Sequence, residues 1–289
     1  MSTTTDQRRL LALELKVAKA MFKQLDIIQL PDEVILLQRL LLSTEFPDIE
    51  DVVHLISKNE TLAGDVVELA NKLQPKEGLL VPVTSIREAI NRLGMERLKN
   101  LVLSISMTQG MKALSLEQLQ QHSIDVAQIC AHLSAFVDID QEEAYLIGLF
   151  HNVGALLMMS KFSEYESLFF KSLSAPFSAY RMEERQFHTT HAFIGVLLAD
   201  KWQLNANLKK VMLQHHQPLH HLTGSSVIDL VAMVQLADAL VIESTYGEYL
   251  SDEVKLMRKQ AQAHLMVPEE NLHDLRIALL TNQLTASTE

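Results

Sequence analysis

Glycine and proline are scarce in this sequence, and their scarcity limits the possible folds more than any other feature does. The chain contains 9 Gly and 7 Pro among 289 residues, whereas soluble proteins usually devote about 12% of their residues to these two types. Short strands need frequent turns, and turns depend on Gly and Pro. The sequence therefore leaves little room for a protein of many strands and favours helices.

Apolar residues recur at helical spacing along the chain. A leading amphipathic helix is predicted over 6–25, and Leu62, Val66, Leu69 and Leu73 line one face of the next clear example, 61–73. The later helices are predicted over 116–137, 142–160, 165–173, 187–201, 206–216, 226–246, 251–263 and 268–280. No strand pattern of useful length interrupts them, so the predicted fold class is all-α.

Capping residues predict where several of these helices begin and end. Pro31 suits the first position of a helix, Asp48 follows Pro47 as a candidate N-cap, and Ser85 with Glu88 has the spacing of a capping box. Gly94 is placed to end that helix in the left-handed conformation. The stretch 74–82 is looser, and the Thr/Ser tail after residue 280 is expected to fray.

Charge and composition exclude several classes of protein. Lys+Arg number 25 and Asp+Glu 36, giving a net charge of −11, so a general nucleic-acid binder is not expected. The 48% hydrophobic content is that of a packed globular protein. With a single cysteine, Cys130, no secretory leader and no apolar run of about 20 residues, we expect a cytoplasmic protein that does not span a membrane.

Histidines cluster in the second half of the chain. Those between positions 122 and 221 are His122, His132, His151, His188, His191, His215, His216, His220 and His221. His151 and Asn152 fall inside the apolar helix predicted over 142–160, where a buried polar pair costs free energy unless it is hydrogen-bonded or binds a ligand. A core histidine bonded to a carbonyl is the alternative for any single member, and His188, His220 and His221 are expected at the surface.

Several segments, in this order, resemble the HD superfamily of metal-dependent phosphohydrolases, and more closely its HDOD branch. They span about residues 25 to 245. They are Leu30-Pro31, Thr61-Leu62-Ala63 through Leu69-Ala70-Asn71, Val83 through Gly94, His191-Ala192-Phe193-Ile194-Gly195, Trp202, and His215-His216-Gln217-Pro218. The resemblance implies an HD-domain-like multi-helix bundle with an N-terminal helical lobe, divided into 1–25 (leading helix), 26–115 (N-terminal lobe), 116–250 (HD-like lobe) and 251–289 (helical pair and tail).

The resemblance also implies a metal site. In catalytic relatives, the positions that match His122, His151, the aspartate after it and Asp238 bind one metal ion. The positions that match His191, His215 and His216 bind a second, and the two ions activate a water for phosphoester attack. This chain departs from the pattern, because Asn152 replaces the aspartate and Ala155 the lysine that often follows it.

The departure shapes the predicted function. We expect a stand-alone regulatory protein of signal transduction that lacks hydrolysis and binds a partner protein or a nucleotide messenger. The alternative is a metal-dependent phosphohydrolase with a reduced site. For the cofactor, we expect histidines that pack without metal, with one divalent ion (Mn, Fe, Zn or Mg) as the alternative.

The remaining candidates have simpler interpretations. Trp202 and Cys130 are expected to pack in the core, and 183–185 (Glu-Glu-Arg) is expected to form a solvated turn, although relatives place a glutamate near it in the cleft. No motif of a serine hydrolase, a P-loop NTPase, a zinc finger or an RNA-binding protein occurs.

Overall fold

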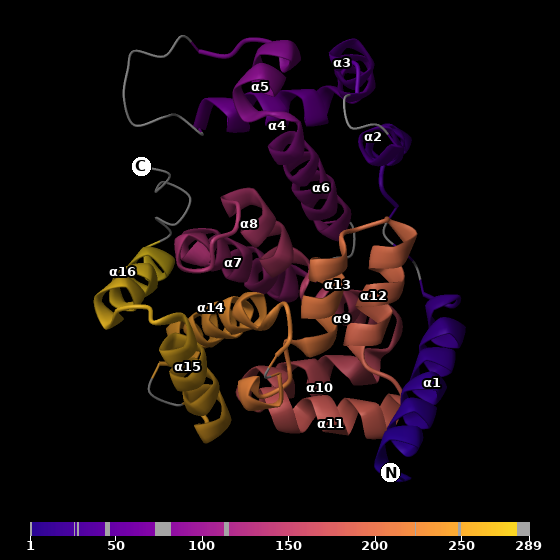
Figure 1. The fold of residues 1–289 in the computed structure, drawn as a ribbon, viewed down its shortest axis with the longest axis vertical. Coiled ribbons are helices and arrows are strands. Elements are labelled where there is room, and N and C mark those ends of the chain that lie inside the picture. The colour runs from indigo at the N-terminus through magenta and orange to yellow at the C-terminus, as the bar shows by residue number, and fades with distance from the viewer. Residues whose placement is uncertain are drawn as a thin grey trace. The chain divides into compact units, whose positions relative to one another are not determined.

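The computed structural model describes residues 2–25, 27, 29–43, 47–72, 82–112, 116–222, 224–247 and 250–281. Over these ranges every regular element is a helix (Figure 1), which confirms the all-α prediction. The chain divides into two compact units, Met1–Ile27 with Leu116–Thr281, and Ile28–Ser115. The expected tail 282–289 and most of the expected loop 74–82 lie outside the described residues. Among the described helices, none is both long and apolar enough to cross a bilayer.

The smaller unit, Ile28–Ser115, contains five helices within the described ranges. They are α2 (Asp32–Ser43), α3 (Ile49–Ser57), α4 (Glu60–Lys72), α5 (Ile86–Leu93) and α6 (Met95–Lys112). The predicted caps are present: Asp48 Oδ1 accepts the amide of Glu50 at 2.9 Å, and Ser85 Oγ accepts that of Glu88 at 3.2 Å. The side-chain amide of Asn71 connects α4 to the segment before α5 through two hydrogen bonds. Its Nδ2 donates to the carbonyl of Val83 at 2.8 Å, and its Oδ1 accepts from the backbone N–H of Val83 at 2.7 Å.

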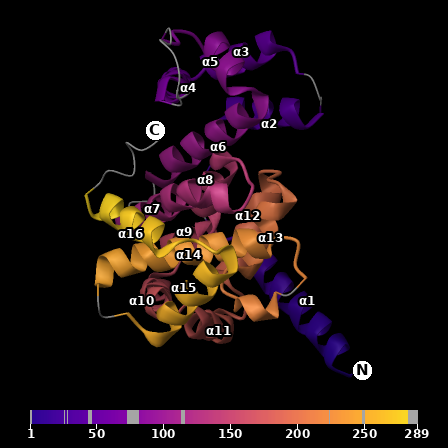
Figure 2. The ribbon, with the colours of Figure 1, turned by 60° about the vertical axis from the view of Figure 1, so that its left-hand side comes forward.

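The larger unit is built around α14 (Ile228–Tyr246), whose residues from 231 to 242 are buried on every side. Its other helices are α1 (Ser2–Phe22), α7 (Glu117–Leu133), α8 (Gln141–Phe150), α9 (Val153–Lys161), α10 (Ser163–Ser174), α11 (Pro176–Phe187), α12 (His191–Lys201), α13 (Ala206–Gln214), α15 (Asp252–Leu265) and α16 (Glu269–Leu280), with short 3-10 turns at Ser134–Phe136 and Leu219–His221. Helices α7, α8 and α15 pack directly against α14 (Figures 1 and 2).

The helix predicted over 142–160 is wrong as a single element, because it breaks at His151 and Asn152 into α8 and α9. The ring of His151 donates from Nδ1 to the carbonyl of Gly148 at 2.5 Å. In an unbroken helix, the N–H of Asn152 would bond to that carbonyl, so the side chain competes with the backbone ladder. Asn152 then starts α9 with its own carbonyl, which accepts from Ala155 at 2.9 Å.

Two further boundaries differ from the prediction. Residues 183–185 lie within α11, not in a solvated turn, and α11 begins at Pro176, a first-turn proline that sequence analysis overlooked. The helix predicted from 187 begins at His191, since His188 adopts a left-handed conformation with φ 56° and ends α11.

Helices α7 and α8 approach each other closely at Gly148. A Cβ built on Gly148 would lie 2.7 Å from Cα of Ala127 and 3.0 Å from Sγ of Cys130, which is itself fully buried. Backbone atoms of a packed helix cannot retreat as a flexible side chain can. The absence of a side chain at position 148 therefore sets the spacing between α7 and α8.

We predict that Gly148→Ala destabilises the protein by about 1–3 kcal/mol, because the added methyl forces the two helices apart. Gly64→Ala is the matched control, since nothing lies within 4 Å of a Cβ at that position of α4, and the same change there should add about 0.5–1 kcal/mol of stability. Urea unfolding measures both. Equal effects of the two substitutions would contradict the proposed clash.

The leading helix α1 packs against α12, and its Glu14 faces Glu184 of α11. Burial, the hydrogen bond with Glu184 and the charge of Glu184 together raise the pKa of Glu14 to about 7. The fold therefore favours the protonated form of Glu14. Its contribution to stability is present at acid pH and is lost as the pH rises through 7.

We predict that the melting temperature of Glu14→Gln rises relative to that of the wild type as the pH is raised from 5 to 8.5. Glu14 becomes charged next to Glu184 over this range, whereas Gln stays neutral. Differential scanning fluorimetry across this range measures the difference. Glu166→Gln, at an exposed position of α10, should show no such trend. If the difference in melting temperature between the wild type and Glu14→Gln stays constant with pH, Glu14 does not hold a proton against Glu184.

Candidate functional site

The structure brings together the six residues that sequence analysis named as candidate metal ligands. His122 lies on α7, Asp238 on α14 and His191 at the first position of α12, while His151, His215 and His216 follow the ends of α8 and α13. They form two triads, His122 with His151 and Asp238, and His191 with His215 and His216, and within each triad the ligand atoms lie within 4.8 Å of one another. All six side chains are buried.

Glu183 joins the site, although the sequence analysis assigned it to a solvated turn. Its side chain is 3% exposed. One carboxylate oxygen accepts from the backbone N–H of His191 at 2.5 Å, and the other accepts from Nδ1 of the same residue at 2.7 Å. Glu183 therefore holds both the ring of His191 and the start of α12. The only signal in the sequence was the family expectation of a glutamate near this position.

Hydrogen bonds to Nδ1 determine which ring nitrogen faces the cluster. Nδ1 of His191 bonds a carboxylate, Nδ1 of His215 donates to the carbonyl of Met212 at 2.8 Å, and Nδ1 of His151 donates to Gly148. A carbonyl oxygen only accepts, so Nδ1 carries the proton in His215 and His151. In the neutral rings, Nε2 then carries a lone pair that points into the cluster.

The rings of the two triads form one continuous group. The Nε2 atoms of His191 and His215 lie 3.2 Å apart, and the ring centroid of His215 is 5.4 Å from that of His151. Burial lowers the pKa of His151 to about 4 and, with the neighbouring imidazoles, lowers the pKa values of His215 and His216 well below 6.5. These three rings are therefore neutral at pH 7.

The other end of the group carries the negative charge. Nε2 of His122 lies 2.9 Å from Oδ1 of Asp238, but the two atoms are not aligned as a hydrogen bond. Burial would raise the pKa of Asp238, yet the adjacent His122 outweighs burial and keeps that pKa below its usual range. Asp238 is thus an anionic carboxylate beside the ring of His122.

Several buried polar atoms in this cluster have no hydrogen-bond partner among the residues that the structure describes. They are Nε2 of His122, His151 and His216, Oδ1 of Asp238 and Oδ1 of Asn152. Native proteins rarely leave so many buried polar atoms unpaired in one place, and each deserves an explanation. Lone pairs that converge in this way are the arrangement that a divalent cation needs.

The remaining candidates lie elsewhere. His188, His220 and His221 are exposed. Trp202 is 4% exposed, and its ring meets the edge of Phe150 at a centroid distance of 5.8 Å, as expected of a packing residue. Burial raises the pKa of the Cys130 thiol, which therefore stays protonated and inert.

Solved structures share this fold. A candidate phosphohydrolase from Shewanella amazonensis is similar over 93% of this chain and 96% of its own, with 20% identity and a TM-score of 0.68. An HDOD domain protein with unknown function from Geobacter sulfurreducens is similar over 95% of this chain and 99% of its own, with 23% identity and a TM-score of 0.63.

A candidate signal transduction protein from Marinobacter aquaeolei is similar over 95% of this chain and 66% of its own, with 19% identity and a TM-score of 0.60. At these identities the likeness shows the fold alone. No curated protein matches the sequence. The model of the HDOD domain matches residues 27–218, which is more than half of the chain, and this protein therefore belongs to the HDOD domain family.

Proposed function

We propose that this chain is a regulatory HDOD protein of signal transduction that acts by binding a partner protein or a nucleotide messenger and does not hydrolyse phosphoesters. The observation that carries the proposal is Asn152. It is buried beside the cluster, directly after His151, at the position where the family pattern places an aspartate. An amide brings a neutral oxygen to that position and no charge.

Electrostatics explains why this one substitution matters. Two divalent cations about 4 Å apart, the spacing of binuclear sites, repel by about 17 kcal/mol at an effective dielectric constant of about 20. A carboxylate between them offsets much of that repulsion. Among the six candidate ligands only Asp238 is a carboxylate, and Glu183 is already bonded to His191. A pair of ions would lack the negative charge that holds such pairs together.

One ion fits the residues better than two ions or none. Two nitrogens bound to one tetrahedral zinc lie about 3.3 Å apart, from Zn–N distances of about 2.0–2.1 Å. Nε2 of His191 and Nε2 of His215 lie 3.2 Å apart, and the Nε2 atoms of His151 and His216 beside them have no hydrogen-bond partner among the described residues. The geometry thus favours a single divalent ion over the metal-free packing that the sequence suggested. Imidazole ligands suit Zn or Fe better than Mg or Mn.

A metal-dependent phosphohydrolase is the second candidate. It is favoured by the unpaired atoms of the His122, His151 and Asp238 triad, which would bind a second ion if the charge were supplied. A bound ion would act as a Lewis acid toward a phosphoryl oxygen. The two candidates differ in one measurable quantity, the number of ions retained per chain.

We predict that the wild type retains about one equivalent of divalent metal after exposure to Zn²⁺ or Mn²⁺ and desalting, whereas Asn152→Asp retains about two. Plasma mass spectrometry measures the content. Asn91→Asp, at an exposed position of α5, adds the same charge away from the cluster and should leave the content at one.

Hydrolysis of bis(p-nitrophenyl) phosphate provides the functional test on the same samples. We expect no turnover above background from the metal-loaded wild type. Two equivalents in the wild type together with turnover would establish the phosphohydrolase and overturn the regulatory proposal.

Glu183 supplies a second prediction. Glu183→Gln removes the carboxylate that orients His191, and loss of such an outer partner typically weakens metal binding by about 10–100-fold. Competition with a zinc-binding dye measures the dissociation constant, and Glu166→Gln serves as the control. If Glu183→Gln and the wild type bind Zn²⁺ equally, the cluster does not use His191 as a ligand.

A further inference from the structure

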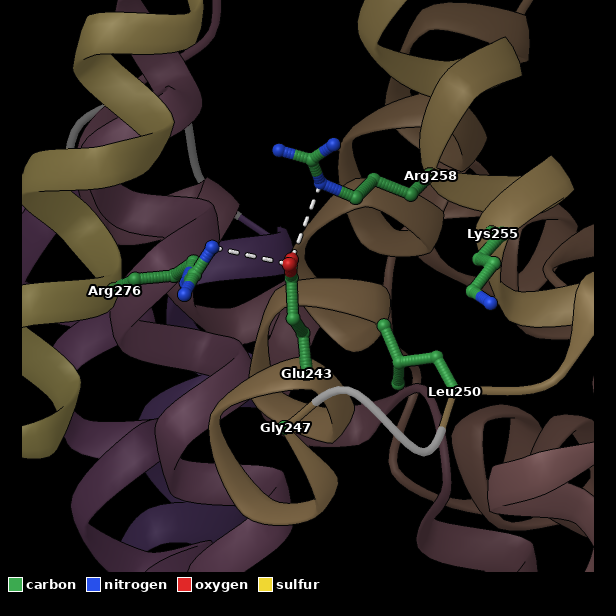
Figure 3. Close-up of a pocket in the computed structure, with 6 residues that line it drawn as sticks. All are labelled: Glu243, Gly247, Leu250, Lys255, Arg258 and Arg276. Atoms are coloured by element: carbon green, nitrogen blue, oxygen red, sulfur yellow. Dashed lines mark hydrogen bonds and ion pairs between the residues drawn. The ribbon is translucent and has the colours of Figure 1, made fainter.

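A pocket of about 490 Å³ is lined by residues of α14, α15 and α16 and of the loop between α14 and α15 (Figure 3), none of which belongs to the histidine cluster. Its described lining residues are Glu243, Gly247, Leu250, Lys255, Arg258 and Arg276. All of them follow residue 218, where the match to the HDOD domain ends. The family resemblance therefore assigns this pocket no role, and its chemistry is a property of this chain's own C-terminal helices.

Positive charge dominates the lining. Three of the six residues are basic, and the one carboxylate among them, Glu243, is shared by two arginines (Figure 3). Nη1 of Arg276 donates to Oε1 of Glu243 at 3.1 Å, and Nε of Arg258 lies 3.2 Å from Oε2. Outside the lining, Arg258 also pairs with Glu269 at 2.5 Å. Three cations thus face two carboxylates in a chain whose net charge is −11.

The basic groups keep donors that no acceptor in the described residues uses. Nε of Arg276 is buried without an aligned hydrogen-bond partner among the described residues, whereas Nε of Arg258 faces Glu243. Lys255 stands on the other side of Glu243 from Arg276 (Figure 3), and none of the ion pairs among the described residues includes it. Glu243 therefore holds the two guanidinium groups in place without consuming their capacity to donate.

The shape of the pocket suits a small molecule. Gly247 has no side chain and a φ of 60°, and Leu250 forms an apolar wall. The volume lies in the range of about 300–1,000 Å³ that is usual for ligand sites. Forked guanidinium donors next to a lysine match the oxygens of a phosphate or carboxylate group.

We propose that this pocket binds a small ligand through an anionic oxygen group, phosphate or carboxylate, held by Arg276, Arg258 and Lys255. The site is separate from the histidine cluster, and it needs no metal. The proposal does not depend on whether the cluster hydrolyses phosphoesters.

Isothermal titration calorimetry with inorganic pyrophosphate tests the proposal on the full chain, after chelation and desalting. We expect saturable binding with one equivalent per chain. Citrate, titrated in parallel, distinguishes recognition of phosphate from recognition of carboxylate, and either ligand satisfies the proposal. The absence of saturable binding by both probes up to millimolar concentration would overturn it.

Variants locate the binding. Lys255→Gln changes an exposed residue that forms no ion pair with the described residues, so it should fold normally and weaken binding by about tenfold, the usual effect of losing one charge-assisted hydrogen bond. Lys259→Gln removes the same charge one turn further along α15, outside the lining, and should leave the affinity unchanged. Arg276→Gln should abolish binding, and its melting temperature reports any loss of folding. Binding that survives both Lys255→Gln and Arg276→Gln would place the anion elsewhere, including the histidine cluster, and refute the site.

Discussion

Helices α9 and α12 cross so closely that no side chain fits between them, and the histidine cluster depends on this contact. A Cβ on Gly154 would lie 1.9 Å from the carbonyl oxygen of His191 and 2.6 Å from the nitrogen of Gly195. His191 opens α12, and His151 lies just before α9, so the crossing fixes the start of one helix against the start of the other. The cluster is therefore positioned by helix packing and not by flexible loops.

Five imidazoles can be buried together because hydrogen bonds fix the orientation of several rings and burial keeps several of them neutral. Carbonyl or carboxylate oxygens occupy Nδ1 of His151, His191 and His215, which fixes the ring orientation and leaves Nε2 toward the interior. Burial lowers the pKa values of His151, His215 and His216, so positive charges do not accumulate among them. The unpaired Nε2 atoms cost stability in the absence of a ligand, and this cost is what a bound cation would recover.

Sequence patterns predicted the helices well where apolar periodicity and caps agreed, as at Asp48 and Ser85. Gly94 ends α5 with the expected positive φ of 77°, but its ψ of 164° is not that of the left-handed conformation. The patterns failed at His151, because periodicity continues smoothly through a residue whose side chain takes a backbone acceptor away from the helix. The grouping of His122 with His151 and Asp238 came from family resemblance, since spacing alone does not bring three distant helices together. Glu183 was misassigned because a charged triplet on a short helix looks solvated until the fold places α12 over it.

The balance of charge connects Glu183 and Asn152. Asp238 contributes one negative charge directly to the cluster, and Glu183 contributes another through His191, so a single divalent ion would leave the buried group electrically neutral. A second ion would leave two uncompensated positive charges among buried side chains, which is costly. An aspartate at position 152 would remove one of those charges and bridge the ions. Under the proposed function, this chain keeps the candidate ligand positions for two ions but only the negative charge that a single ion needs, and this imbalance is the reason for proposing regulation in place of phosphoester hydrolysis.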